Sequence, residues 1–280
     1  MTGMRQRTTN VTAYGDLTSP EVPDALSGAT LVWPVGGLEQ HGPHLPLSVD
    51  FDIPDALARQ VVAEVGGLLL PGQPFSARSL PQSGGGLHFP GTVHIGGGTF
   101  VDYLTHCLRG LARLAPARLV VINGHYENEG LLFEAIDGCE PGTTFPHTEI
   151  VAFSWWSLVE DDWLGKHVPE FPGWHAEHAG LTETSLMMYL RPDVVRAARP
   201  THSTPPPPGV YRHPVDVDRM SNQGVLSSTT GAGAELGEKL FWHVLDGITR
   251  TLADGPAGPA GPAGPAGPAG PAGPADPASA

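Results

Sequence analysis

The chain has 280 residues, of which 40% are apolar and 16% charged, a composition typical of a globular protein rather than a disordered or fibrous one. Its 29 acidic and 15 basic side chains give a formal net charge of -14, which disfavours binding to phosphate backbones and to anionic lipid headgroups. We therefore expect no nucleic-acid partner and no membrane partner.

The opening segment MTGMRQRTTN contains no apolar stretch typical of a signal peptide. No run of the chain approaches the ~20 apolar residues that a membrane helix needs, so a cytoplasmic location is expected. Cys107 and Cys139 are isolated thiols without CxxC spacing, which favours ordinary buried cysteines over a disulfide framework or a thiolate zinc site.

Short apolar runs alternate with longer amphipathic stretches, a pattern typical of βα units around a largely parallel sheet. Strands are predicted over residues 29–35, 67–70, 118–122 and 149–153. Helices are predicted over 53–65, 128–136, 179–190 and 234–252. A further helix is predicted from Thr99, where Thr99 and Asp102 could form a capping box. We expect residues 1–254 to form one α/β catalytic domain.

Two segments are not predicted to form regular secondary structure. Between Thr201 and Ser228 the chain contains the prolines 205–208, which lack the N–H group that a helix or a central strand requires. A long surface loop is expected there, either an oligomer contact or plain irregular surface. Residues 255–275 are seven Gly-Pro-Ala triplets. So few triplets without a trimerisation element favour a disordered tail over 255–280 rather than a collagen helix.

Metal-capable side chains follow two of the predicted strands directly. The first segment is PVGGLEQHGPHLPLSVD (34–50), and the second is NGHYEN (123–128). Ligand sites in parallel α/β sheets form in the loops beyond the carboxyl ends of strands, so both segments lie where function is expected. The candidate ligands are Glu39, His41, His44, Asp50, His125 and Glu127.

The spacing of these residues favours a pair of metal ions. Glu39 and His41 are two positions apart, as are His125 and Glu127, and residues i and i+2 of an extended backbone project to the same side. With Asp50, whose two oxygens could bridge neighbouring ions, five mixed nitrogen and oxygen ligands suit two Zn²⁺ or Mn²⁺ ions, which can share and ionise a water molecule. The alternative is that these are separate surface or capping residues. The presence of two such pairs, each at a strand end and each next to glycines that permit tight turns, disfavours this alternative.

His44 could be a further ligand or a partner behind the ligands. Trp156 follows the fourth predicted strand, and Trp174 lies in the segment GWHAEHAG (173–180). The two tryptophans could stack on a flat substrate or could belong to the core or an interface.

His178 could transfer protons near neutral pH, or Glu177 and His178 could cap a helix or lie exposed. For Glu183, in the first turn of that helix, a structural role is favoured.

Together these segments resemble the creatininase (creatinine amidohydrolase) family. The resemblance covers nearly all of residues 31–252 and is carried by PVGGLEQHGPHLPLSVD, SGGGLHFPGT, INGHYEN, GWHAEHAGLTETSLM and the later PVD and GVLSS segments. Several amidohydrolases of the family share the EQH and NGH segments, whereas SGGGLHFPG and NGHYEN resemble its creatininase branch. The Gly-Pro-Ala tail has no counterpart in the family pattern.

The resemblance implies a role for each matching residue. One ion would be bound by Glu39, Asp50 and His125, and the other by His41, Asp50 and Glu127, with Asp50 as the bridge. The residues around the substrate would be Ser83, Gly124, Tyr126, Trp156, Trp174 and His175. His178 would move the proton and Glu177 would support it, so these two and Glu127 form the implied catalytic set. His175 stands where the family has Asp, which could alter lid packing or substrate preference.

We therefore expect a metal-dependent cyclic amidohydrolase on a three-layer α/β/α sandwich with a mostly parallel central sheet. The leading hypothesis is reversible hydrolysis of creatinine to creatine by a metal-bridged hydroxide, with His178 protonating the departing nitrogen. A second hypothesis is the same chemistry on another cyclic amide or on a peptide end, as in mycofactocin-precursor peptidases. A third is a non-catalytic scaffold that acts through the tail. The resemblance further implies two divalent ions per subunit and a homohexamer.

Overall fold

A four-stranded parallel sheet forms the centre of the protein. The computed structural model describes residues 6–254 except positions 9, 85, 169, 201, 203–207 and 215–222. The sheet has the order β2-β1-β5-β6, and all three neighbouring pairs are parallel. Its strands are β1 (Thr30–Val35), β2 (Leu68–Leu69), β5 (Arg118–Asn123) and β6 (Glu149–Ser154), so all four predicted strands are present.

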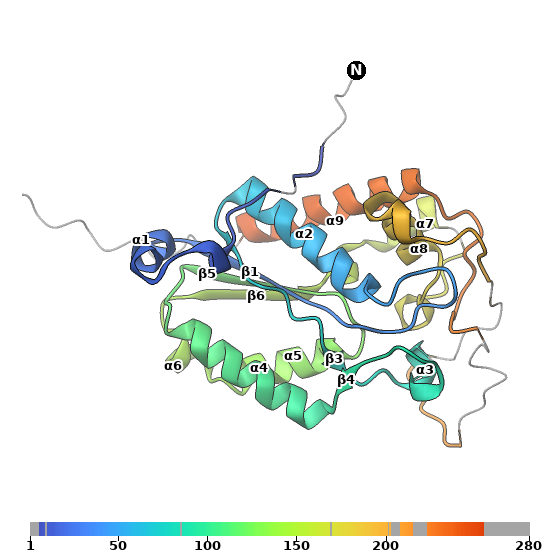
Figure 1. Cartoon of the computed structure of the whole chain (residues 1–280), viewed down its shortest axis with the longest axis horizontal. Coiled ribbons are helices and arrows are strands. Elements are labelled where there is room, and N and C mark those ends of the chain that lie inside the picture. Colours follow the sequence, from blue (N-terminus) through green and yellow to red (C-terminus); the bar gives the residue numbers. More distant parts are fainter. Residues whose placement is uncertain are drawn as a thin grey trace, which may run out of the picture.

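Helices cover both faces of this sheet, which confirms the predicted three-layer α/β/α fold (Figure 1). The layer above the sheet in Figure 1 contains α2 (Val49–Val65) and α9 (Ala234–Asp254), and α8 (Leu181–Leu190) packs against both. The layer below contains α4 (Gly97–Ala112) and α5 (Asn128–Asp137), which pack against each other.

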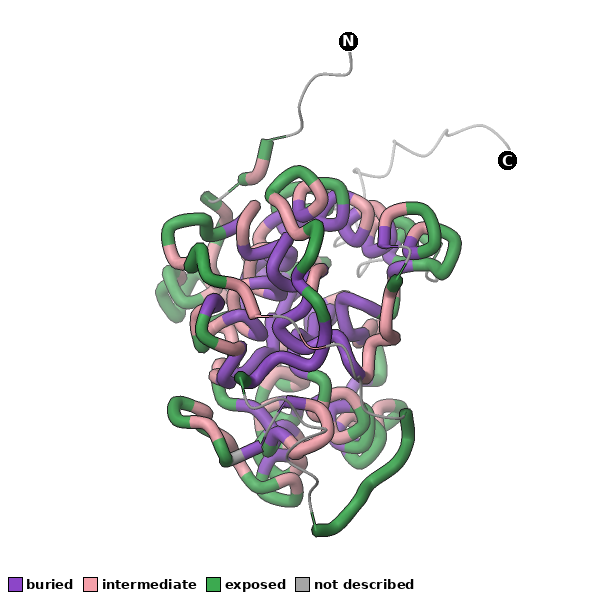
Figure 2. The backbone as a smooth tube through the Cα atoms, turned by 90° about the vertical axis from the view of Figure 1, so that its right-hand side faces the viewer, coloured by how far each residue is buried: buried purple, intermediate pink, exposed green. Residues whose placement is uncertain are grey.

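Alternate residues of the strands divide the core into two parts. In β1, Val32 joins the apolar cluster under α2, α8 and α9, whereas Leu31 and Trp33 join the cluster on the α4 and α5 side. In β5, Val120 joins the first of these clusters and Leu119 joins the second. This alternation follows from the two-residue period of a strand. The buried positions lie in the interior in Figure 2, and each fully buried Val or Leu contributes about 1.5–3 kcal/mol.

Several short elements were not predicted, because a segment of two to seven residues shows too little periodicity to be recognised. The short strands β3 (Ser76–Ala77) and β4 (His94–Ile95) pair in parallel as a separate sheet. The short α-helices are α1 (Val22–Leu26), α3 (Pro81–Gly84), α6 (Pro141–Thr144) and α7 (Asp161–His167). The 3-10 segments are η1 (Tyr14–Asp16), η2 (Ser19–Glu21), η3 (Gly86–His88), η4 (Trp155–Leu158), η5 (Trp174–Ala176) and η6 (Pro192–Val194).

Two predicted helix starts were wrong. Helix α2 begins at Val49 instead of residue 53, so Asp50 lies in its first turn. The helix contains Pro54 internally. Helix α4 begins at Gly97 after Gly96, which provides no side-chain cap, so the capping box of Thr99 and Asp102 does not form.

The described part of segment 201–228 contains no helix or strand, in agreement with its prolines. The predicted Gly-Pro-Ala tail, 255–280, lies outside the described residues. No helix in the described ranges is both long enough and apolar enough to span a membrane.

Candidate metal centre and active site

Three strand ends bring the predicted site segments together. The register pairs Val35 of β1 with Asn123 of β5, and Asn123 with Ser154 of β6. The segments that carry Glu39 and His125 therefore leave the sheet side by side, next to the tryptophans that follow Ser154. The first turn of α2 adds Asp50 from the adjacent layer. This edge is where parallel sheets form their ligand sites.

Glu39, Asp50 and His125 form the first group of ligands. One atom from each lies within 4.8 Å of the other two, and all three residues are buried. His125 Nδ1 is 3.0 Å from Asp50 Oδ2 and 3.2 Å from Glu39 Oε2. These three residues are the set that the family resemblance assigns to one ion.

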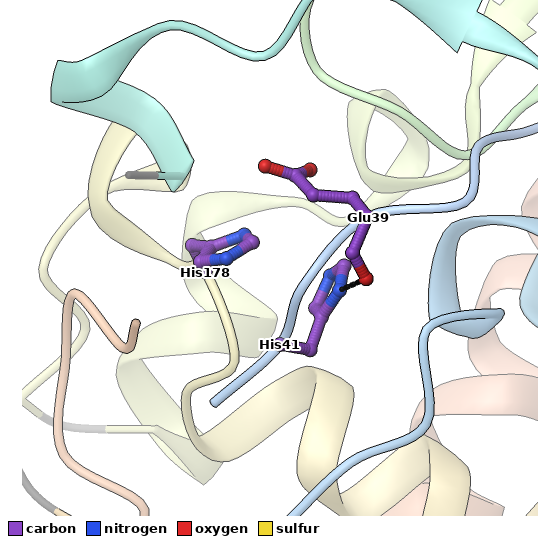
Figure 3. A group of neighbouring side chains, drawn as sticks. All are labelled: Glu39, His41 and His178. Carbon is purple, nitrogen blue, oxygen red and sulfur yellow. Dashed lines mark hydrogen bonds between the residues drawn. The ribbon is translucent and has the colours of Figure 1, made fainter. Parts of the chain in front are cut away.

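Asp50 also belongs to a second group, with His41 and Glu183. His41 Nε2 is 3.2 Å from Asp50 Oδ1 and 3.6 Å from Glu183 Oε2. A third group contains Glu39, His41 and His178, which Figure 3 shows around the loop after β1. The His41 ring is fixed through Nδ1, which lies 3.1 Å from the backbone oxygen of Glu39. Its other nitrogen faces the ligand groups.

The groups fit divalent cations on two observations. His41 Nε2 is buried and has no hydrogen-bond partner among the described residues, although carboxylate oxygens surround it. Five carboxylates line one small pocket here: Glu39, Asp50, Glu127, Glu177 and Glu183. Imidazole and carboxylate ligands together suit borderline ions such as Zn²⁺ and Mn²⁺, so the donor set agrees with the predicted metal type.

The pKa values show how strongly these buried charges interact. Burial raises the pKa of Glu39 to about 7, with His125 opposing this shift and the charges of Asp50 and Glu127 adding to it. Burial alone would lower the pKa of His41 and His125, but the neighbouring carboxylates raise both well above the usual value. Positive charge among these carboxylates is therefore favourable, and this is what a divalent cation would supply.

Glu127 is a member of none of the three ligand groups among the described residues, although it contacts His125. Its Oε2 is 3.3 Å from Nε2 of His125, the opposite ring nitrogen from the one that faces Asp50. Its Oε1 accepts hydrogen bonds from the backbone N–H of Leu80, at 2.9 Å, and from the Ser83 hydroxyl. The backbone of Glu127 is helical rather than extended, so the two-residue spacing brings His125 and Glu127 together through a turn. The place of Glu127 in the second ligand set stays a prediction.

The first ligand group, Glu39, Asp50 and His125, lines an inner pocket of about 30 Å³. Its walls include Trp155, Trp156 and Trp174. Trp155 lies between the other two, with ring centroids 5.7 Å from Trp156 and 5.4 Å from Trp174 and edge-to-face geometry to both. Tyr126 stacks on Trp156 at 6.1 Å. The structure thus places the predicted Ser83, Gly124, Tyr126, Trp156 and Trp174 around one cavity with the ligands.

His178 lies beside the ligands as a neutral ring. Its pKa is well below the usual value because the ring is buried and because the charge of His41, whose ring centroid is 4.3 Å away, opposes protonation. Its Nε2 is 2.9 Å from Nε2 of Gln40. Oε1 of that amide accepts from the Gly42 N–H, so the NH₂ group faces His178 Nε2, and its two hydrogens are shared with the backbone oxygens of Gly84 and Gly224.

Glu177 supports the segment that carries His178. Its Oε1 accepts hydrogen bonds from the N–H and hydroxyl of Thr182, both at 2.6 Å, and its Oε2 accepts from the Ser227 hydroxyl at 2.9 Å. Burial, and then the charge of Glu183, raise the pKa of Glu177 to about 7. The carboxylate therefore joins the start of α8 to the segment after residue 222, in agreement with the predicted capping alternative.

Comparison with known proteins assigns the family. The family model described as creatinine amidohydrolase (creatininase) matches residues 15–252. The chain belongs to the creatininase family. It is accordingly a hydrolase of the creatininase type, which acts on C–N bonds.

Its relatives within the creatininase family include two kinds of enzyme. Creatinine amidohydrolase of Pseudomonas putida is 37% identical over 238 residues, which cover 82% of this chain and 91% of that protein. Mycofactocin precursor peptide peptidase of Mycobacterium tuberculosis is 32% identical over 254 residues, covering 85% and 90%. A solved structure of a manganese creatininase superimposes with a TM-score of 0.80 at 35% identity and covers 88% of this chain and 98% of that one.

His175, the departure from the creatininase pattern, does not line the inner pocket. It faces a second, outer pocket together with Ser83 and Tyr126. His44 is buried, and its Nε2 is 2.9 Å from the Thr184 hydroxyl on α8. It belongs to none of the ligand groups among the described residues.

Three residues of the creatininase site were missed by sequence reasoning. Glu183 was expected to stabilise its helix, but its buried carboxylate also faces His41. Trp155 is buried at the inner pocket, and its indole N–H has no hydrogen-bond partner among the described residues. Gln40 holds His178. The sequence offered one signal for Gln40, its position between Glu39 and His41.

Replacing Gln40 by leucine is expected to lower kcat by about 10- to 100-fold, the usual effect of losing a partner that orients a catalytic group. The side chain also donates to the backbone oxygens of Gly84, at 2.5 Å, and Gly224, at 3.1 Å, so some loss of thermal stability should accompany it. The NH₂ group of Gln40 faces His178 Nε2 and so favours the neutral ring. Without it the ring should be protonated more easily, which would move the acidic limb of the kcat–pH profile to higher pH. An unchanged pH profile together with a lower kcat would indicate a purely structural role.

Proposed function

We propose that this protein catalyses the reversible hydrolysis of creatinine to creatine with two divalent metal ions per subunit. The observation that carries the proposal is the pair of ligand groups that share Asp50, which itself lines a pocket walled by tryptophans. The 37% identity to the creatinine amidohydrolase of Pseudomonas putida supports the same substrate. The homohexamer implied by the family resemblance stays a prediction.

The two ions would be held by residues that the fold already places together. Glu39, Asp50 and His125 would bind one, and His41 and Asp50 the other, completed by Glu127 as the resemblance implies or by Glu183 as the grouping favours. When bound, a divalent pair polarises an amide carbonyl and makes water more acidic. Asp50 would contribute to both ions, since its Oδ2 faces His125 and its Oδ1 faces His41.

His178 supplies the proton transfer. Because the ring is neutral at rest and lines the inner pocket, it can accept the proton that the attacking water loses. It can then donate this proton to the ring nitrogen as the C–N bond breaks, so the residue acts first as base and then as acid. Glu177 keeps His178 in place through Thr182 and Ser227.

The aromatic walls favour a small planar substrate. Trp156 and Trp174 both line the inner pocket and both pack against Trp155, so their rings are held in fixed orientations. Indole rings stack favourably on a delocalised cationic or neutral guanidino group and exclude water from the reacting bond. The Trp155 N–H, buried and unpaired within the described structure, offers a hydrogen-bond donor to the substrate.

A second candidate function is cleavage of a peptide end. The mycofactocin precursor peptide peptidases, at 31–32% identity, are the observation that favours it. Both candidates use the same ligand groups, so metal content cannot separate them. A parallel assay of creatinine and a short peptide separates them directly.

The metal-loaded protein is expected to convert creatinine into creatine and to contain about two Zn²⁺ or Mn²⁺ ions per chain by elemental analysis. Removing the ions with a chelator should abolish turnover and lower the unfolding temperature, because the buried carboxylates then lose their compensating charge. Glu127→Gln should bind fewer ions if Glu127 is a ligand. A parent protein that is active without metal would refute the mechanism, and peptide cleavage without creatine formation would favour the second candidate.

A further inference from the structure

A second pocket adjoins the inner pocket. It encloses about 320 Å³, against about 30 Å³ for the inner pocket. Ser83, Tyr126 and Glu127 line both, so the two hollows adjoin at these three side chains. We call the second hollow the outer pocket. A substrate whose amide group lies at the ligands has room to extend there.

The walls of the outer pocket are largely apolar and aromatic. They include Leu80, Val210 and Tyr211 in addition to Tyr126. Tyr211 is 61% exposed, Tyr126 47% and Val210 45%. These are three of the nine exposed large hydrophobic residues in the described part of the chain. A cluster of exposed apolar side chains beside a catalytic pocket is typical of a ligand-binding surface.

The walls come from segments far apart in the sequence. Gln82 and Ser83 belong to α3, whereas Val210 and Tyr211 belong to the segment 208–214, which appears in orange beside α3 in Figure 1. His175, from η5, closes the side next to the tryptophans. The outer pocket is therefore formed by tertiary structure rather than by one loop.

The charges of the lining residues restrict what the outer pocket accepts. Among its described lining residues there is no lysine or arginine, and the one carboxylate is Glu127, which is held by Leu80 and Ser83. A substituent with a carboxylate would meet Glu127 without a strong cationic partner, which is unfavourable in a partly buried site. An uncharged apolar group can instead cover Tyr126, Val210 and Tyr211.

We propose that the outer pocket binds an uncharged apolar or aromatic substituent on the cyclic amide, so that the enzyme accepts substrates larger than creatinine. The inference rests on the proposed function for the position of the amide at the metal ligands. It deepens that function by naming the substrate class, namely cyclic amides with a neutral substituent of about the size of a benzyl group.

The test compares creatinine with two analogues that carry a benzyl group, one on the ring nitrogen in place of methyl and one on the ring CH₂ carbon. Binding to the metal-loaded protein is measured by calorimetry, and hydrolysis is measured separately by product formation. At least one analogue is expected to bind about tenfold more tightly than creatinine, because burial of the phenyl ring is favourable.

Tyr211→Ala should reduce the affinity ratio of the better analogue to creatinine about tenfold. Because Tyr211 is mostly exposed, the variant is expected to fold, which its unfolding temperature will confirm. Tyr103→Ala is the matched control, since Tyr103 is an exposed tyrosine on α4 outside both pockets. It should leave the affinity ratio unchanged.

The outcomes separate the inference from the proposed function. Analogue binding that depends on Tyr211, without hydrolysis of creatinine, would support the outer pocket and refute creatininase activity. Creatinine hydrolysis with analogues that bind no better than creatinine would overturn the outer-pocket inference alone. An affinity ratio that Tyr211→Ala leaves unchanged would also overturn it.

Discussion

Asp50→Asn is expected to lose most of the bound metal and to lower kcat for creatinine by at least about a thousandfold, the scale expected when a group shared by the whole catalytic unit is lost. Asp50 is the one residue common to the Glu39 and His125 group and to the His41 and Glu183 group. Asparagine keeps the shape of the side chain but replaces one anionic oxygen with an NH₂ group, which cannot bind a cation. One substitution therefore weakens both ion sites.

The matched control is Asp52→Asn, two residues along the same first turn of α2. The Asp52 carboxylate binds the Ser48 hydroxyl at 2.8 Å and Arg191 Nη1 at 3.2 Å and belongs to no ligand group in the described structure. It should keep its metal and lose at most about 1 kcal/mol of stability, as for other partly exposed ion pairs. Elemental analysis and steady-state kinetics check both variants. An Asp50→Asn protein with two ions and near-normal kcat would contradict a bridging role.

The sequence was sufficient to predict the sheet and the position of the site at its edge. Strands such as 118–122 are continuous apolar runs because both faces of a parallel sheet are covered, and the ligand segments follow such runs directly. The register of Val35, Asn123 and Ser154 then brings together loops that are far apart in the chain. The family resemblance added the roles, and the structure places its first ligand set, Glu39, Asp50 and His125, in one group.

What the sequence could not predict depends on tertiary contacts. Glu183 looks like an ordinary first-turn carboxylate, and only the packing of α8 beside α2 brings it near His41. The amide of Gln40 gains its role through oxygens of Gly84 and Gly224, which lie 44 and 184 residues away. Neither pairing leaves a periodic or local signal, because side-chain contacts across such separations are set by the fold.

Gly124 shows how closely the fold and the site depend on each other. The resemblance assigned it to the substrate, and it does line the inner pocket. It also lies under the first turn of α2: a methyl group at this position would lie 2.6 Å from Pro54 Cγ and even closer to the backbone oxygen of Asp50. Its own N–H donates to the backbone oxygen of Val35 at 2.9 Å, so the backbone of Gly124 is tied to β1 and has little freedom to move away.

Gly124→Ala is therefore expected to destabilise the protein by about 1–3 kcal/mol, the usual cost of overpacking a rigid core, and to lower the unfolding temperature by about 2–4 °C for each kcal/mol. Because the displaced turn carries Asp50, metal affinity and kcat should fall with it, although no ligand has been changed. Calorimetric unfolding and metal titration measure the two effects.

Gly130→Ala is the matched control for this prediction. Gly130 lies within α5, and a methyl group there would meet nothing within 4 Å, so the substitution should stabilise the helix by about 0.5–1 kcal/mol and leave metal binding unchanged. If Gly124→Ala lowered stability while metal affinity stayed normal, the turn of α2 would not be what positions Asp50. If both glycine variants had the same stability and metal affinity, the close approach of Gly124 to α2 would not contribute to either. Opposite signs for the two variants would identify the contact between Gly124 and α2 as a determinant of the metal centre.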